Sequence, residues 1–193
     1  MSEGRHRVLK RAVLVFWGFL VIFPAVSGCE PRLENSLTVT KVYDGDTVLL
    51  SNGEKVRLIG IDCPEAYESE KLFRDARRTQ HDVEVIKAQG RQAKDIAARL
   101  AHGKRVILEY DLEKRDQYNR LLAYVYIPLA SGQGQDPELY MTEKDGAPCI
   151  FLNASLLRMG YAKPMTIPPN TRYADFFKTL HQEARQAGKG LYR

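Results

Sequence analysis

The chain has 193 residues, of which 44% are hydrophobic and 27% are charged, and it contains three cysteines. This length and apolar content suffice for one domain with its own core, which argues against a disulfide scaffold and against a disordered chain. The first 28 residues hold four of the 29 basic side chains and one of the 24 acidic ones, so the rest of the chain is close to neutral. A strongly basic face that holds duplex DNA nonspecifically is therefore not expected.

The N-terminus has the pattern of an export signal. Basic residues near the start precede an uncharged apolar run at 12–28, which is at the short limit for a membrane span. The run ends in Val26-Ser27-Gly28-Cys29, which resembles a bacterial lipobox and implies lipidation of Cys29. We expect a signal peptide at 1–28 and a tether at 29–36, with the folded part outside the cytoplasm and anchored to a membrane. An uncleaved signal anchor and an ordinary secretory peptide stay open as alternatives.

Residues 37–65 have the composition of short strands, with apolar and largely β-branched residues throughout. Asn52-Gly53 divides this stretch, and the dipeptide favours a two-residue type I′ hairpin. Such a hairpin brings Asp46 and Asp62 together although 16 residues separate them. Neighbouring carboxylates repel each other unless a cation or a proton lies between them, so we predict a divalent metal ion there.

The charged segment at 66–88 is expected to be partly helical. It is either a solvated loop or a flap whose basic side chains grip a substrate, and the sequence leaves both open. The remaining expected elements, in chain order, are a helix at 89–102, strands at 105–110 and 121–127, a surface excursion at 128–148, and helices at 153–159 and 173–187.

Three motifs occur in order along the chain. They are Asp44-Gly45-Asp46-Thr47, then Arg57-Leu58-Ile59-Gly60-Ile61-Asp62-Cys63-Pro64-Glu65, then Asp116-Gln117-Tyr118-Asn119-Arg120-Leu121-Leu122-Ala123-Tyr124-Val125. Together they resemble the staphylococcal nuclease (thermonuclease) family, and the resemblance covers residues 37–193. It implies an α+β fold, mainly a β barrel: a five-stranded OB-fold barrel with about three packed helices.

The resemblance also implies a metal site. Asp46 and Asp62 would bind Ca²⁺ through their carboxylates, and Cys63 would bind it through its backbone carbonyl. Calcium is a hard ion that takes several oxygen ligands, so the residue types agree with this assignment. In a regular strand, positions 57 and 62 point to opposite faces, so a shared site requires a break between them, and Gly60 is the expected place.

Three further roles follow from the resemblance. Glu65 would position or deprotonate the attacking water. Arg57 and Arg120 would bind the phosphate, because a planar guanidinium can donate two hydrogen bonds to phosphate oxygens. Tyr118 would contact a terminal phosphate. The chain departs from the family pattern at Gln117, where a lysine is usual, so nucleotide affinity is expected to differ. It departs again at Asn119, where the family has a glycine, and asparagine is the residue next best able to adopt a left-handed turn.

The function that these motifs imply is a calcium-dependent nuclease acting on DNA and RNA, with 3′-phosphate products, present as a monomer. The alternative is a noncatalytic nucleic-acid-binding OB module of the cell envelope. A disulfide between Cys63 and Cys149 stays open, since both would remain in the mature chain of an exported protein.

Overall fold

The computed structural model describes residues 37–80, 82–129 and 136–193, all of which lie in the compact unit that runs from Glu34 to Arg193. The predicted signal peptide, the tether and Cys29 lie outside the described residues. Among the helices described, none is long and apolar enough to cross a membrane.

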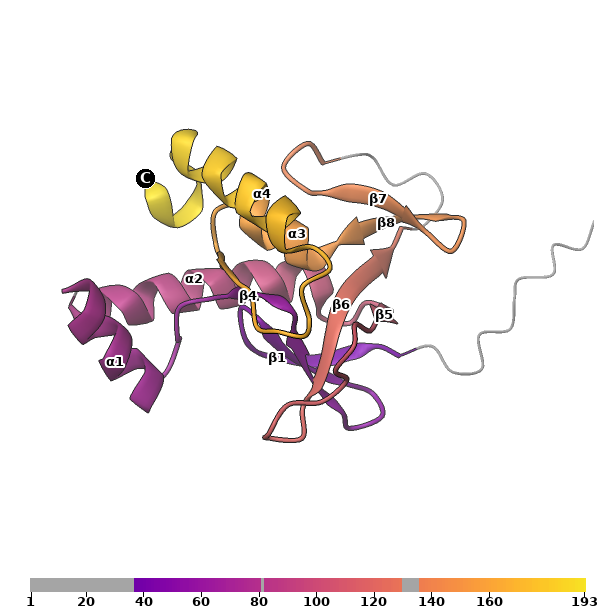
Figure 1. Ribbon diagram of the computed structural model, residues 1–193, viewed down its shortest axis with the longest axis horizontal. Helices are drawn as coiled ribbons and strands as arrows, with labels where there is room; N and C mark the ends of the chain where they lie inside the picture. Colours follow the sequence, from indigo (N-terminus) through magenta and orange to yellow (C-terminus); the bar gives the residue numbers. More distant parts are fainter. Residues whose placement is uncertain (1–36, 81, 130–135) are drawn as a thin grey trace, which may run out of the picture. The chain divides into compact units, whose positions relative to one another are not determined.

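The described residues form nine strands, four α-helices and one short 3-10 helix (Figure 1). In chain order the elements are β1 (Val39–Asp44), β2 (Thr47–Leu50), β3 (Lys55–Leu58), β4 (Gly60–Asp62), α1 (Glu70–Thr79), α2 (Val83–Ala101), β5 (Ile107–Glu109), β6 (Leu121–Pro128), β7 (Met141–Lys144), β8 (Ala147–Phe151), α3 (Leu152–Arg158), β9 (Lys163–Met165), α4 (Ala174–Gln186) and η1 (Gly190–Tyr192).

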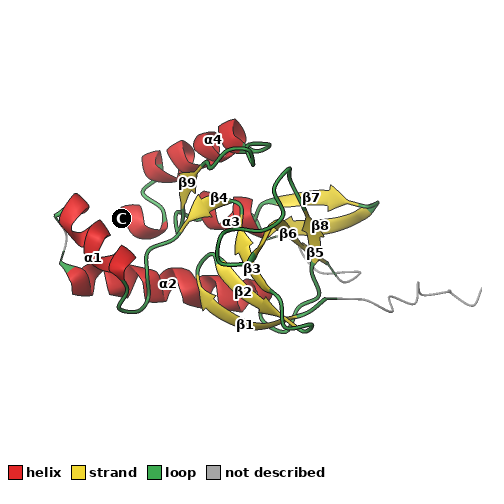
Figure 2. Cartoon of the chain, turned by 60° about the horizontal axis from the view of Figure 1, so that its bottom comes forward, coloured by secondary structure: helices red, strands yellow, loops and turns green. Residues whose placement is uncertain are grey.

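Most strands belong to one mixed sheet, in the order β1-β2-β3-β6-β8-β7, and β5 also pairs with β6 (Figure 2). The β3–β6 pair is parallel and the other pairs of this sheet are antiparallel. β4 leaves this sheet and pairs with β9. The segment that leads into β5 reaches β1 through the isolated Thr38–Arg105 bridge, and the Val39 N–H donates to the Lys104 carbonyl at 3.0 Å.

Five strands, β1, β2, β3, β6 and β5, therefore follow the expected OB-type arrangement. Only isolated bonds join β1 to the segment before β5 in the part of the chain that the structure describes. The result is an OB-like α+β fold, as the resemblance implied, and within the described residues no continuous ladder closes its barrel.

Two local expectations are corrected. The segment at 66–88 is partly helical, as expected, but it holds α1 and the first turns of α2, so the described residues form four α-helices in place of about three. Polar N-caps explain both starts: the Ser69 hydroxyl accepts from the Leu72 N–H at 3.0 Å, and the Asp82 carboxylate accepts from the Glu84 N–H at 2.7 Å. The hairpin after β2 is not type I′, because only Gly53 has a positive φ (84°) and type I′ needs two such residues.

The excursion predicted at 128–148 also contains regular structure. β7 lies entirely within it, and β8 begins there at Ala147. In the β7–β8 turn, Asp145 and Gly146 have φ of 53° and 76°, and positive φ at both residues is typical of a tight hairpin turn. The glycine- and proline-rich composition of the segment hid this hairpin from the sequence analysis.

Asn153, the second residue of α3, forms hydrogen bonds with two separate segments of the core. Its side chain is fully buried; the amide nitrogen donates to the Ile59 carbonyl at 2.9 Å, and the amide oxygen accepts from the Val125 N–H at 3.0 Å. The Ile59 peptide lies between β3 and β4, so this one side chain holds the point where the chain leaves the main sheet.

We predict that Asn153→Ala lowers the free energy of unfolding by about 2–4 kcal/mol, because it leaves a buried carbonyl and a buried N–H unpaired. Urea denaturation measures this difference. The matched control is Asn52→Ala, since Asn52 accepts a single bond, from the Glu54 N–H, on the exposed hairpin. Equal losses in the two variants would contradict the role of Asn153.

Candidate active site

The break at Gly60 brings the two halves of the second motif together. Gly60 has a φ of 79°, and a Cβ on it would lie 2.6 Å from the Phe177 ring, so only glycine fits this position. β3 ends just before it and β4 begins at it. The Arg57 and Asp62 side chains consequently meet, with 3.3 Å between Nη2 and Oδ1. The expected break at Gly60 is confirmed.

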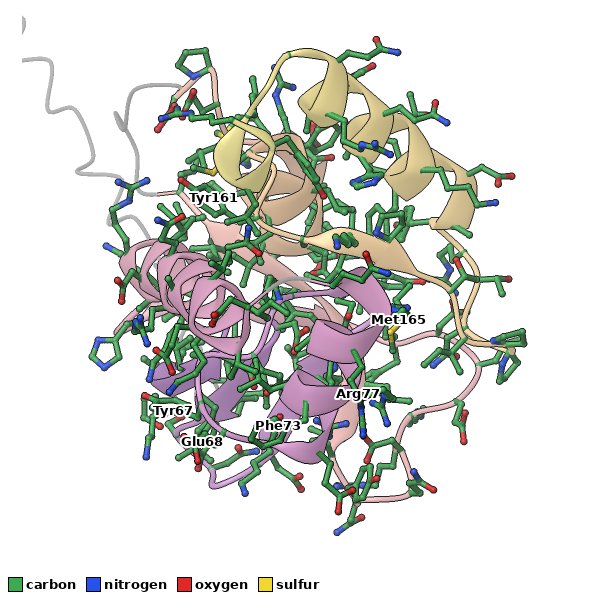
Figure 3. The ribbon with its side chains drawn as sticks, turned by 90° about the vertical axis from the view of Figure 1, so that its left-hand side faces the viewer. Tyr67, Glu68, Phe73, Arg77, Tyr161 and Met165 are labelled. Atoms are coloured by element: carbon green, nitrogen blue, oxygen red, sulfur yellow. The ribbon has the colours of Figure 1, made fainter. Side chains whose placement is uncertain are left out.

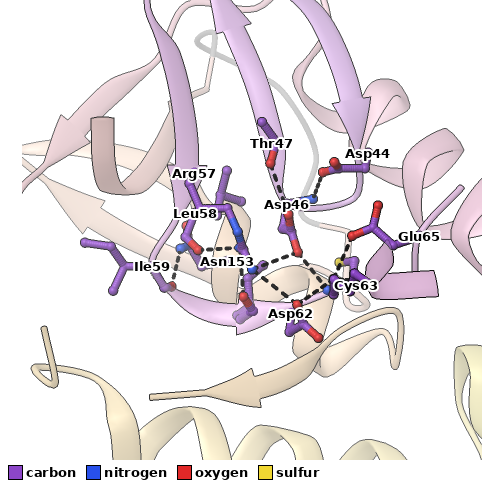
Figure 4. Close-up of polar contacts among 12 residues, drawn as sticks. Asp44, Asp46, Thr47, Arg57, Leu58, Ile59, Asp62, Cys63, Glu65 and Asn153 are labelled. Atoms are coloured by element: carbon purple, nitrogen blue, oxygen red, sulfur yellow. Dashed lines mark hydrogen bonds and ion pairs between the residues drawn. The ribbon is translucent and has the colours of Figure 1, made fainter. Parts of the chain in front are cut away.

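The Arg57 guanidinium lies between the two aspartates of the first two motifs (Figure 4). Its Nη2 is 3.2 Å from Asp46 Oδ2 and 3.3 Å from Asp62 Oδ1. Its Nη1 donates to the carbonyls of Leu58 and Ile61, each at 2.9 Å. The sequence predicted a metal ion between these carboxylates; in the structure, a side-chain cation links them.

Asp46 is buried, and both of its carboxylate oxygens accept hydrogen bonds. Only 4% of the residue is exposed, and its Oδ2 accepts from the Cys63 N–H at 2.8 Å while its Oδ1 accepts from the Thr47 hydroxyl at 3.2 Å. Burial alone would lower the pKa of Arg57, but the carboxylates of Asp46 and Asp62 raise it above its ordinary value. The guanidinium is therefore a permanent charge of this site.

The Cys63 side chain takes no part in the chemistry. Burial, and then the charge of Asp46, raise the pKa of its thiol well above the ordinary value, so the sulfur stays protonated and is not a nucleophile. Cys63 and Cys149 are both buried free thiols. The disulfide that the sequence left open is not formed.

A second cation, which the sequence motifs do not reveal, lies in the same site. Lys71 Nζ is 2.8 Å from Asp62 Oδ1, 2.9 Å from Glu65 Oε1 and 3.0 Å from the Cys63 carbonyl oxygen. Burial alone would lower the pKa of Lys71, but Asp62 and then Asp46 raise it above the ordinary value. One ammonium thus contacts three of the oxygens that the family resemblance assigns to a metal ion and to the attacking water.

Helix packing explains the position of Lys71. It is in the first turn of α1, two residues after the Ser69 cap, so it faces back toward the loop that carries Glu65. α2 lies against the same loop, because a Cβ on Gly90 would be 2.2 Å from the Glu65 carbonyl oxygen. The one signal in the sequence was the cap: a helix that begins after Ser69 places position 71 near the second motif.

The oxygens of this site are of the types that a hard cation binds. They are the carboxylates of Asp46 and Asp62 and the Cys63 carbonyl, with Asp44 beside them. Burial, and then the charge of Asp46, raise the pKa of Asp44 to about 7. In the described part of the chain, no group of three or more His, Cys, Asp or Glu is arranged to hold a metal ion. Arg57 and Lys71 form ion pairs with the carboxylates of this site.

Arg120 and Tyr118 come from the turn before β6, the strand that pairs with β3. Asp116 fixes Arg120, whose Nε is 2.7 Å from Oδ2 and whose N–H donates to Oδ1 at 3.0 Å. The exposed Tyr118 ring has its centroid 5.4 Å from Arg120 Cζ. The β3–β6 register pairs Arg57 with Leu122, so Arg120, two residues earlier, is on the same face of the sheet as Arg57.

The turn that carries these two residues has the expected backbone. Asn119 has a φ of 62°, the left-handed conformation that asparagine tolerates better than most residues, and its N–H donates to the Asp116 carbonyl at 2.9 Å. The replacement of the family glycine is therefore compatible with the turn. Arg120 is the residue that directly precedes β6.

Comparison with known proteins gives consistent matches. Residues 55–193 match the profile of the staphylococcal nuclease homologue family. An uncharacterized protein of Methanocaldococcus jannaschii is 32% identical over 164 residues, which are 80% of this chain and 70% of that protein. The thermonuclease of Staphylococcus intermedius is 27% identical over 86% of both chains. Endonuclease YncB of Bacillus subtilis is 29% identical, over 81% of this chain and 60% of its own length. On this match and on the geometry of its three motifs, the chain belongs to the staphylococcal nuclease family.

Proposed function

We propose that this protein is a calcium-dependent nuclease that hydrolyses phosphodiester bonds in DNA and RNA and leaves 3′-phosphate ends. The convergence of Asp46 and Asp62 on Arg57, and of Asp62 and Glu65 on Lys71, carries the proposal. Membership of the nuclease family, and relatives named thermonuclease and endonuclease, support the coarser statement that the chain is a phosphodiester hydrolase. The choice of calcium, the action on RNA and the nature of the ends are our inference from the family resemblance, and the oxygen-rich site agrees with the choice of calcium.

Glu65 is the proposed general base. Its carboxylate is 23% exposed, so water reaches it, and the ion pair with Lys71 uses only Oε1. A carboxylate at hydrogen-bond distance from a water can orient that water and accept its proton as it attacks phosphorus. The backbone of the loop is held by Pro64 and by the close approach of α2 at Gly90, which keeps Glu65 in place.

Arg57 and Arg120 are the proposed phosphate ligands. Both carry permanent charge on the same face of the sheet, and phosphate oxygens gain negative charge as the attacking water adds. Arg57 is largely buried, with 11% of its side chain exposed, whereas 29% of Arg120 is exposed. We assign Arg120 to the incoming phosphate directly and Arg57 to the phosphate and to the alignment of Asp46 and Asp62. Tyr118, next to Arg120, would contact a terminal phosphate or a base.

Calcium, when bound, would supply positive charge against the phosphoryl oxygens. Asp46, Asp62 and the Cys63 carbonyl are the oxygens that would hold it. The same three groups are bonded to Arg57, Lys71 or each other in the structure, so loading requires at least one side-chain cation to move.

We also propose that the protein is exported and held at a membrane by a lipid on Cys29, as a monomer. The sequence of residues 1–29 supports the export and the anchor. A neutral folded domain on a tether would then meet nucleic acid outside the cytoplasm.

The central experiment measures cleavage of plasmid DNA, single-stranded DNA and RNA by the purified protein, with calcium and then with a chelator. We expect cleavage with calcium and a loss of at least about 100-fold in rate with the chelator, since the ion offsets charge in the transition state. Products should have 5′-hydroxyl ends, which accept labelled phosphate from a kinase without prior dephosphorylation. Equal rates in both conditions would remove calcium from the reaction. Binding of DNA without any cleavage would favour the noncatalytic module.

A second prediction concerns Glu65→Gln, which keeps the shape of the side chain and removes its basicity. Turnover should fall by about 100- to 1000-fold while the melting temperature stays close to that of the wild type. The control is Glu54→Gln, because Glu54 is also ion-paired, to Arg115 at 2.8 Å, but lies on the hairpin outside the site. Unimpaired turnover in Glu65→Gln would reject the assigned role.

A further inference from the structure

We propose that Lys71 is a built-in competitor of the divalent cation: its ammonium holds the metal-binding oxygens in the metal-free protein, and calcium binds by displacing it. The inference deepens the proposed function and rests on it, because it concerns the same site. It adds a residue that none of the three sequence motifs contains, contributed by the helix that follows the second motif.

The contacts of the ammonium match those of a bound ion. A lysine ammonium carries three hydrogens, and Lys71 Nζ has three oxygens within 3.0 Å: Asp62 Oδ1, Glu65 Oε1 and the Cys63 carbonyl oxygen. Two of these groups, Asp62 and the Cys63 carbonyl, belong to the proposed calcium ligands. The lysine therefore satisfies the same oxygens that a metal ion would require.

Simultaneous occupation is disfavoured by charge. An ammonium and a divalent ion that share one carboxylate oxygen would be only a few ångströms apart, and their repulsion in a partly buried site is large. Arg57 is a poor candidate for leaving, because two backbone carbonyls and two carboxylates brace it and 11% of its side chain is exposed. Lys71 is 26% exposed and ends a flexible four-carbon stem, so it is the cation that can leave.

The helix that carries Lys71 is suited to this exchange. Leu72 anchors α1, since it is fully buried, but it is not part of the large hydrophobic cluster that fills the barrel. The neighbouring Phe73 and Arg77 are exposed to solvent, and Figure 3 shows both side chains on the surface of α1. Rotation of the lysine stem toward solvent leaves the Leu72 contact intact, so the site can open without unfolding α1.

The competition has a defined consequence for metal binding. When the ligand-ready state is only a fraction of the population, the apparent affinity falls by that fraction. Lys71 should therefore weaken calcium binding and make the nuclease respond at a higher calcium concentration. It should also keep Asp62 and Glu65 aligned when no metal is bound, because it neutralises their mutual repulsion.

The test compares the calcium affinity of the wild type with that of Lys71→Met, measured by isothermal titration calorimetry on the purified protein. Lys71→Met keeps most of the stem and removes the charge, so we expect calcium to bind about tenfold more tightly or better. The calcium concentration that gives half-maximal cleavage should fall by the same factor. Lys87→Met is the matched control, because Lys87 pairs with Glu84 at 2.9 Å and with Glu68 at 3.7 Å, outside the site, and its calcium affinity should equal that of the wild type.

Two further variants keep the test decisive. Lys71→Arg retains the charge and should bind calcium about as weakly as the wild type. Lys71→Gln, a smaller polar change, replaces Lys71→Met if circular dichroism shows that the latter is unfolded. Calcium binding that is unchanged or weaker in the folded, uncharged variants overturns the inference. The proposed function fails by a separate result, the absence of cleavage by the wild type at any calcium concentration.

Discussion

The structure of the site depends on one arrangement: the Arg57 guanidinium bridging Asp46 and Asp62. Carboxylates this close, in a largely buried setting, repel each other strongly, and removing the charge that separates them would cost several kcal/mol. Arginine meets the requirement because its planar fork reaches two carboxylates and two carbonyls at once. The bridge joins β3, β4 and the turn before β2. The same contact therefore sets the geometry of the site and holds the first strands together.

The backbone makes this bridge possible. A regular strand would place Arg57 and Asp62 on opposite faces, and the left-handed residue at Gly60 turns β4 out of the main sheet and toward β9. The Phe177 ring packs where a side chain at this position would be, and Asn153 holds the adjacent Ile59 carbonyl. The site is thus fixed from the core side by residues far along the chain.

Much of this could be predicted from the sequence, and the exceptions have clear physical reasons. Local patterns were sufficient for the strands of the first two motifs, for the break at Gly60 and for the left-handed Asn119. Arg57 between Asp46 and Asp62 was not predicted, because the repulsion of two acids indicates a cation without specifying which one, and the divalent ion at these carboxylates stays a prediction. Lys71 was missed because its place depends on the start of α1 and on how that helix packs on α2, which are tertiary facts. The near-closure of the barrel, through isolated bonds between β1 and the segment before β5, has no signal in the local sequence.

Arg57 and Lys71, the two cations of the site, are held by different parts of the fold. In our proposal this difference is what lets Lys71 control calcium binding while Arg57 stays in place. Arg57 extends from a central strand and is braced by the backbone around it, so its charge belongs to the folded state. Lys71 extends from α1, where Leu72 is the one fully buried residue among those whose burial is described, and Leu72 lies outside the main core. An acidic site that must stay intact without metal, yet accept metal, needs one fixed cation to preserve its shape and one exchangeable cation to offset the remaining charge. A short helix after the second motif is sufficient to provide the exchangeable one, and the ligand oxygens themselves need no change.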